Sequence, residues 1–517
     1  AEYRAQAHHS ARRFARIGSR GARADVIRPG STTADRVTRS LCFTSQSSTL
    51  RPMRRALRIL GRLLVGLLVV LAVAVVAGYW WQRPMILTGT GYAAHNECAV
   101  RNLAGRDDPL SDLPDNPLVP YLGSRVHGSV GEEGAHVTAS MKNTGLAGQE
   151  AFFTPGLGCT LAQEGDPGFA PRVSDAASFG PNPLDGAPVR PLTGARSSDL
   201  DRAIDTAFGD DLDPAEQQQL GTRAVVVVKG DRVVAERYAP GFDADAPQLG
   251  WSMSKSATNL YVGRLVQEGK VDIHAEGIRP EWTEDKASIT LDDLLRMQSG
   301  LAWDETYELG TPITEMLYRQ DDMGDYAAAR DLAHPVGAHR QYSTGSTQLV
   351  CDTVRQKLGV DDRDEAAALP YRWLLEPLGL RSARWEPDAS GTTACGSYLW
   401  MTPRDWAALG MFARDDGRWD GKQLLPKGWM RSSTTEDPAE GEPEPYGSTW
   451  WLRTGAHQPP YFRSLPKDTY WMSGHDGQRT VVVPSADLVV VRMGFSPTYA
   501  DQDPRVEQLV RAAIDAT

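Results

Sequence analysis

The sequence lacks the features that mark several large classes of protein. Only five of its 517 residues are cysteines, and no two of them form a Cys-x-x-Cys pair. No glycine-rich phosphate-binding loop stands between a predicted strand and a predicted helix. The formal net charge is -11, which is the wrong sign for binding nucleic acid. We therefore expect no redox dithiol, no nucleotide-phosphate loop and no nucleic-acid partner.

Histidines are the remaining candidates for a metal site, and their spacing does not provide one. His334 and His339 are five residues apart on a loop of proline and glycine, with no third ligand nearby in the sequence. A zinc site needs three or four protein ligands. The sequence therefore predicts no metal site and implies no cofactor.

Residues 1–52 differ in composition from the rest of the chain. They contain many arginines, no lysine, no methionine and no sustained apolar period. A segment of this kind is too polar to build a core. We expect it to be a disordered or mis-called N-terminal extension, and nothing in it supports an RNA-binding or targeting role.

A long apolar run follows at residues 63–81. Its 19 residues carry no charge, approach the roughly 20 needed to cross a bilayer, and end in a tyrosine and two tryptophans. Five arginines precede it: Arg51, Arg54, Arg55, Arg58 and Arg62. We predict a basic flank and transmembrane anchor at residues 53–82 in the inner (cytoplasmic) membrane, with the main body periplasmic or extracellular. The alternatives are a buried soluble helix and a cleaved signal peptide, whose apolar region is usually about 7 to 15 residues long.

Residues 83–198 are predicted to form a small β-rich unit followed by a linker. Short apolar stretches alternate there with Gly, Asn, Asp and Pro turns, and from residue 165 the chain becomes rich in Pro, Gly, Ser and Asp. The whole chain is 41% hydrophobic, enough to bury a large core in two or three domains.

Residues 199–517 carry the patterns of a larger domain. We predict a helix at residues 199–208, hairpins at 224–238 and 480–493, and a last helix capped by Asp503. The segment between the hairpins is mostly helical in pattern. The expected fold class is α+β, an antiparallel β-sheet flanked by helices with a mostly helical subdomain.

The motif Ser252-Met253-Ser254-Lys255 carries the first chemical signal. On a helix, Ser252 and Lys255 lie on one face, one turn apart. A hydroxyl needs a base to become a nucleophile, and a lysine that is held nearby and uncharged can supply it. The alternative interpretation is a helix N-cap serine followed by a solvated lysine.

Two downstream segments favour the catalytic interpretation of Ser252 and Lys255 over the N-cap interpretation. Tyr342 follows a turn-rich approach that begins at Pro335, and His475-Asp476-Gly477 precedes a predicted strand. Serine and lysine on a helix, a tyrosine on a loop and His-x-Gly on a strand, in that order, resemble the class C β-lactamase and penicillin-binding-protein-like serine hydrolases. The resemblance covers roughly residues 200–517 and is closest to the branch typified by 6-aminohexanoate-dimer hydrolase. Connecting phrases at residues 294–301, 377–380 and 396–405 also look like that family.

The resemblance implies roles for the proton-transfer residues. Ser252 is the expected nucleophile, and Lys255 with Tyr342 forms the expected proton-transfer pair. In this interpretation the tyrosine acts as general base, through its phenolate or through the lysine. The same fold, with the active site between the sheet and the helical part, is implied.

The resemblance also implies residues that bind the substrate and residues that form the oxyanion hole. His475 is expected to polarise the tyrosine or to hold a substrate carboxylate. Gly477 is expected to allow close approach of the substrate to the backbone, and the backbone N–H groups of Ser252 and Gln478 are expected to form the oxyanion hole.

One departure from the family pattern bears on the substrate. The β-lactamase branch has Tyr-x-Asn where this chain has Tyr342-Ser343-Thr344. The amide that would contact an acylamino side chain is therefore absent, and we expect a small-molecule amide or ester substrate. The alternatives are a penicillin-recognising acylation sensor, a true β-lactamase and a D-Ala-D-Ala carboxypeptidase.

Four cysteines follow the predicted anchor, so we expect them to meet an oxidising compartment. We predict the pairs Cys98–Cys159 and Cys351–Cys395, because each pair lies within one predicted structural unit. The alternative is buried free thiols.

Overall fold

The structure is a computed structural model that describes residues 50–113, 116–163, 165–170, 179–193, 196–455, 461–497 and 502–516. The expectation for residues 1–52 falls almost wholly outside the described residues. The chain divides into two compact units, Ala1–Ala74 and Val75–Thr517.

Helix α1 (Leu50–Asn102) contains the predicted anchor but does not end at residue 82. Its apolar side chains up to Val76 are exposed, and the helix is long and apolar enough to cross a membrane, a property that a secretion signal shares. From Leu87 the same helix is buried. A glycine allows the close packing of this buried part of the helix, because a Cβ atom at Gly91 would collide with the Tyr318 carbonyl.

A small four-stranded sheet follows α1. Its strands run in the order β1-β2-β3-β4, all antiparallel, with bounds β1 Leu122–His127, β2 His136–Met141, β3 Gln149–Thr154 and β4 Gly158–Leu161. The disulfide Cys98–Cys159 joins β4 to α1, with 6.1 Å between the Cα atoms. Cys351 and Cys395 form a second disulfide at 6.2 Å. Both predicted pairings are confirmed.

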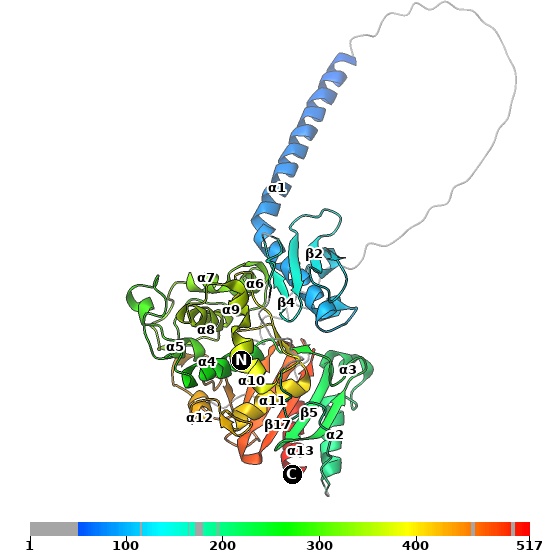
Figure 1. The fold of residues 1–517 in the computed structure, drawn as a ribbon. Helices are drawn as coiled ribbons and strands as arrows, with labels where there is room; N and C mark the ends of the chain where they lie inside the picture. The colour runs from blue at the N-terminus through cyan, green and yellow to red at the C-terminus, as the bar shows by residue number, and fades with distance from the viewer. Residues whose placement is uncertain are drawn as a thin grey trace, which may run out of the picture. The chain divides into compact units, whose positions relative to one another are not determined.

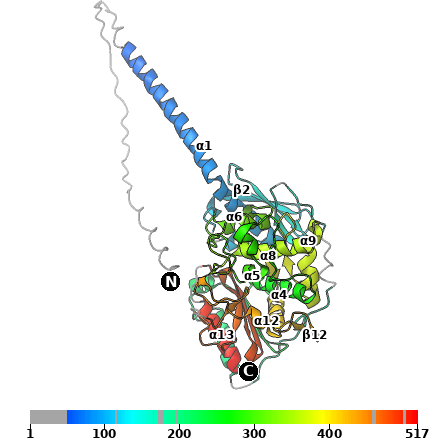
Figure 2. The same ribbon diagram turned by 90° about the vertical axis from the view of Figure 1, so that its left-hand side faces the viewer.

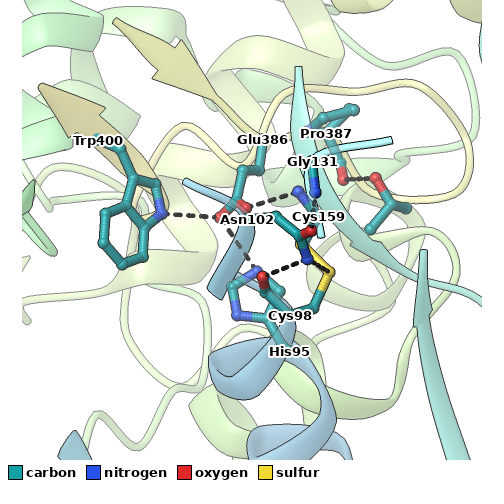
Figure 3. Close-up of a disulfide and its surroundings, with 9 residues drawn as sticks. His95, Cys98, Asn102, Gly131, Cys159, Glu386, Pro387 and Trp400 are labelled. Atoms are coloured by element: carbon teal, nitrogen blue, oxygen red, sulfur yellow. Dashed lines mark hydrogen bonds and ion pairs between the residues drawn. A yellow bond between two sulfur atoms is a disulfide. The ribbon is translucent and has the colours of Figure 1, made fainter. Parts of the chain in front are cut away.

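Glu386 binds this region to the rest of the compact unit (Figure 3). The side chain is fully buried, and its carboxylate accepts hydrogen bonds from the Cys159 N–H at 2.7 Å and from Trp400 Nε1 at 3.1 Å. His95 Nε2, from α1, lies 3.1 Å from the same group. A buried carboxylate is stable only with such partners, so it fixes α1, β4 and the strand of Trp400 to one another.

The main sheet has six antiparallel strands in the order β14-β15-β16-β17-β5-β6. Their bounds are β5 Thr222–Lys229, β6 Arg232–Tyr238, β14 Trp451–Leu452, β15 Tyr470–Gly474, β16 Gln478–Val483 and β17 Leu488–Gly494. Both predicted hairpins are confirmed. The valine run of β5 is buried on both faces, with Val225 and Val227 in one core and Val226 and Val228 in the other.

Helices cover both faces of this sheet (Figures 1 and 2). Helices α2 (Ser197–Ala207) and α13 (Gln502–Ala516) pack on one face, and α11 (Pro403–Arg414) packs on the other. Helix α13 includes Asp503, which was expected to cap it. The Asp503 carboxylate instead accepts two hydrogen bonds from the buried Arg479 guanidinium, at 2.7 and 2.9 Å.

The insert between the hairpins is mostly helical, as predicted. Its helices are α4 Met253–Gln267, α5 Leu291–Leu295, α6 Pro312–Arg319, α7 Met323–Ala328, α8 Thr344–Lys357, α9 Arg363–Pro370, α10 Glu376–Leu378 and α12 Trp429–Ser433, and α3 (Pro214–Leu220) precedes β5. Short strands join them: β7 Gln248–Leu249, β8 His339–Arg340, β9 Arg384–Trp385, β10 Leu399–Met401, β11 Arg418–Trp419, β12 Lys422–Gln423 and β13 Glu440–Gly441. The predicted α+β fold class is confirmed.

Candidate active site

A strand-turn-helix unit presents Ser252. Strand β7 pairs with β10, and the Gly250 N–H donates to the Leu399 carbonyl at 2.9 Å, which fixes the turn before α4. Trp251 has a φ of 48°, an unfavourable conformation for a residue with a large side chain. Ser252 takes the N-cap position but its side chain makes no capping hydrogen bond. The hydroxyl is therefore available for another partner.

That partner is the Lys255 amine, which is 1% exposed. Its Nζ atom lies 2.8 Å from Ser252 Oγ, 2.7 Å from Thr344 Oγ1 and 3.1 Å from the Gly396 carbonyl oxygen. Burial lowers the pKa of Lys255 to about 8, against the opposing influence of the Glu305 carboxylate 3.8 Å away. The alternative of a solvated lysine is wrong, and with this pKa about a tenth of the amine is uncharged at pH 7, far more than for a solvated lysine.

Tyr342 is the third member of this group. The Ser252 side chain acts to lower the pKa of its phenol, and Lys255 Nζ lies 4.7 Å from the centre of its ring. Burial, and then the nearby Glu305 carboxylate, raise the pKa of the phenol. Tyr342 is thus a phenol at neutral pH, which disfavours the expected phenolate base and leaves Lys255 as the group able to accept a proton.

Glu305 and Thr344 belong to the same network and were not predicted. Glu305 accepts hydrogen bonds from Trp303 Nε1 at 2.6 Å and from the Thr344 N–H at 2.9 Å, and the Thr344 hydroxyl donates to its other oxygen. Glu305 lies on the loop after α5, 50 residues from Lys255, where no motif signalled it. In the sequence, Thr344 stands out only because it replaces the asparagine of the Tyr-x-Asn motif, and nothing there indicates its contact with Lys255.

His475 lies on the turn between β15 and β16. Its ring stacks on Tyr307 with centroids 4.4 Å apart and meets Trp251 edge-on at 5.9 Å. A Cβ atom on Gly474 would collide with the Gly250 carbonyl, so this turn lies against the turn that carries Ser252. The structure therefore brings His475 beside the serine-bearing turn.

Gly477 and Gln478 follow on the same turn. Gly477 has a φ of 90°, and a Cβ atom there would collide with Gln502 and approach Arg492, so packing within the protein already requires glycine. The Gln478 side chain accepts from the Gly494 N–H at 2.9 Å and fixes β16 to β17. Substrate approach at Gly477 and the oxyanion role of the Gln478 backbone stay predictions.

Within the described ranges, no group of three or more His, Cys, Asp or Glu side chains is arranged to hold a metal ion.

Comparison with known proteins places this site in a family. A family model described as Beta-lactamase matches residues 201–513, more than half of the chain. The chain belongs to the beta-lactamase family. The 6-aminohexanoate-dimer hydrolase of Paenarthrobacter ureafaciens is 27% identical over 309 residues, which cover 55% of this chain and 74% of that protein. The resemblance seen in the sequence is confirmed.

Solved structures also match the chain. A penicillin-binding protein homologue from Caulobacter crescentus is 17% identical with a TM-score of 0.49, over 64% of this chain and 99% of that one. A beta-lactamase from Mycobacterium bovis is 18% identical with a TM-score of 0.42, over 57% and 93%.

The burial of Lys255 predicts the pH dependence of this site. As pH rises through the lowered pKa of about 8, the amine loses its proton and becomes able to accept one from Ser252. We expect kcat/KM for a p-nitrophenyl ester to rise with pH along a limb centred near 8. An activity that is flat from pH 6 to 10, or a limb near 10.4 as for a solvated lysine, would contradict this.

Proposed function

We propose that the protein is a membrane-anchored serine hydrolase that cleaves amide or ester bonds through an acyl-enzyme on Ser252. The observation that carries the proposal is the 2.8 Å contact between Ser252 Oγ and the buried Lys255 amine. A serine with a neutral amine at hydrogen-bond distance is an activated nucleophile.

The reaction follows from the protonation states of the site. Neutral Lys255 takes the proton of the Ser252 hydroxyl as Oγ attacks the substrate carbonyl. The proton must then reach the leaving amine or alkoxide, and Tyr342, whose ring lies beside Lys255, relays it. Water repeats the sequence on the ester and releases the acid. The backbone N–H groups of Ser252 and Gln478 are proposed to hold the oxyanion.

The substrate class is proposed from the residues around Tyr342. Thr344 stands where the β-lactamase branch has asparagine, and its hydroxyl is engaged by Lys255 and Glu305. The relative from Paenarthrobacter ureafaciens is named for the hydrolysis of a 6-aminohexanoate dimer. Small linear amides and esters, with a carboxylate held near His475, are therefore the proposed substrates.

Labelling with a serine-directed fluorophosphonate tests the nucleophile. Ser252→Ala should abolish labelling and hydrolysis, because it removes the atom that forms the ester. Ser254→Ala and Ser256→Ala are matched controls, since both hydroxyls are buried and donate to the main-chain carbonyls of Trp251 and Thr449. Persistent labelling of the Ser252 variant would refute the nucleophile, and one labelling event without turnover would favour an acylation sensor.

Substrate preference gives a second test. Short-chain p-nitrophenyl esters should be hydrolysed faster than a chromogenic cephalosporin, because their leaving groups need little acid assistance. Tyr342→Phe should lower the rate by roughly a hundredfold or more, the usual effect of a general acid-base group. Cephalosporin turnover above ester turnover by the wild-type protein would reverse the substrate assignment.

The proposed location rests on the apolar part of α1 and its arginine flank. Basic residues favour the cytoplasmic side, so the catalytic domain would face the periplasm or the exterior. A reporter active only outside the cytoplasm, fused after Thr517, should be active. Activity of a cytoplasmic reporter at the same position would show the opposite orientation.

A further inference from the structure

We propose that Glu305 is a positioning residue that, through the Thr344 hydroxyl, directs the lone pair of the Lys255 amine toward Ser252. The inference rests on the acyl-enzyme function proposed above. It assigns a role in that reaction to a residue that does not touch the nucleophile.

Both carboxylate oxygens of Glu305 accept hydrogen bonds from neighbouring residues. Trp303 Nε1 and the Thr344 N–H both reach Oε2, at 2.6 and 2.9 Å. Both groups can only donate, so Oε2 must accept. The Thr344 hydroxyl contacts the other oxygen, Oε1, and an ionised carboxylate can only accept there too. The single hydrogen of the Thr344 hydroxyl is therefore directed at Glu305.

The orientation of the Lys255 amine follows. Because the Thr344 hydrogen points away, Thr344 Oγ1 can only accept from Nζ, 2.7 Å away. The Gly396 carbonyl, 3.1 Å from Nζ, can also only accept. A neutral amine has two hydrogens and one lone pair. Both hydrogens are used by these two acceptors, so the lone pair is left for the third neighbour, Ser252 Oγ at 2.8 Å.

This arrangement is the one that proton transfer needs. The Ser252 hydrogen points at Nζ before the reaction, and no rotation of the amine is required when the proton moves. Without the carboxylate, the Thr344 hydroxyl is able to donate to the Lys255 lone pair. The amine would then donate to Ser252. The hydrogen shared by the two groups would be bonded to Nζ, so the amine could not accept the serine proton.

Glu305→Gln tests this directionality. The two N–H donors at Oε2 require the amide oxygen to stand there, so the amide NH₂ takes the place of Oε1 and donates to Thr344. The Thr344 hydrogen then turns toward Lys255. We expect the plateau kcat/KM for a p-nitrophenyl ester to fall about tenfold or more, a smaller loss than the roughly 10²- to 10⁴-fold contribution of a group that itself transfers the proton.

The pH profile separates this role from loss of structure. The Glu305 carboxylate, 3.8 Å from Nζ, favours the charged amine. Its replacement by a neutral amide should therefore move the acidic limb of kcat/KM to lower pH while the plateau falls. Glu308→Gln, at an exposed position on the same loop, is the matched control and should change neither quantity.

A second pair of variants tests the Thr344 hydroxyl, which links Glu305 to Lys255. Thr344→Val keeps the shape of the side chain and removes the hydroxyl, whereas Thr344→Ser keeps the hydroxyl. We expect the valine variant to lose about tenfold or more in plateau kcat/KM and the serine variant to stay within about threefold of the wild type. If Glu305→Gln fails to fold by circular dichroism, this pair decides the question.

The outcomes separate the two proposals. Hydrolysis that survives Ser252→Ala refutes the acyl-enzyme function and this inference with it. Hydrolysis that requires Ser252, together with wild-type plateau and pH profile in Glu305→Gln or wild-type rates in Thr344→Val, overturns the role of Glu305 alone.

Discussion

The rest of the site depends on the burial of one amine. Lys255 is removed from water on a fully buried stretch of α4, and a buried amine must find acceptors for its hydrogens. Two acceptors come from distant parts of the chain, the start of α8 and the segment before β10, and the third neighbour of the amine is Ser252 on the turn before α4. The packing that brings these segments together therefore also assembles the surroundings of the Lys255 amine, the proposed proton acceptor. The same burial lowers the pKa of Lys255 to about 8, so part of the amine is uncharged near neutral pH.

The region before the matched family segment is joined closely to that segment. Glu386 links α1 and β4 to the strand of Trp400, and leaving a buried group without one of its hydrogen-bond partners costs about 1 to 3 kcal/mol, more when the group is charged. The buried part of α1 also lies beside the loop that carries Glu305 and Tyr307. A Cβ atom at Gly310 would lie 3.7 Å from the Met85 Cβ, and one at Gly89 would lie 3.1 Å from Leu309. Residues 85–91 thus support an active-site loop from outside residues 201–513.

Local signals in the sequence were sufficient for much of this architecture. The valine-rich hairpins, the amphipathic last helix and the Ser-x-x-Lys spacing each depend on neighbouring residues, and the structure contains all three. The anchor was predicted at residues 53–82, and helix α1 continues beyond it to Asn102, where Gly91 allows close tertiary packing. The burial that raises the pKa of Tyr342, and so disfavours a phenolate, is likewise not visible in a linear sequence.

Glu305 shows what linear patterns miss and why it matters for the substrate. Its contacts join residues two and 39 positions away, and only folding brings Thr344 to it. Once they meet, the one hydrogen of the Thr344 hydroxyl is committed to the carboxylate and cannot be donated to a substrate carbonyl. An asparagine at this position would bring two amide hydrogens and retain one for such a contact. With threonine in place of the asparagine of the β-lactamase branch, this position supports Lys255 from within the protein. Under the proposed function, contacts to the acyl group would come from other side chains, and His475 and Tyr307 form a stacked pair beside the serine-bearing turn.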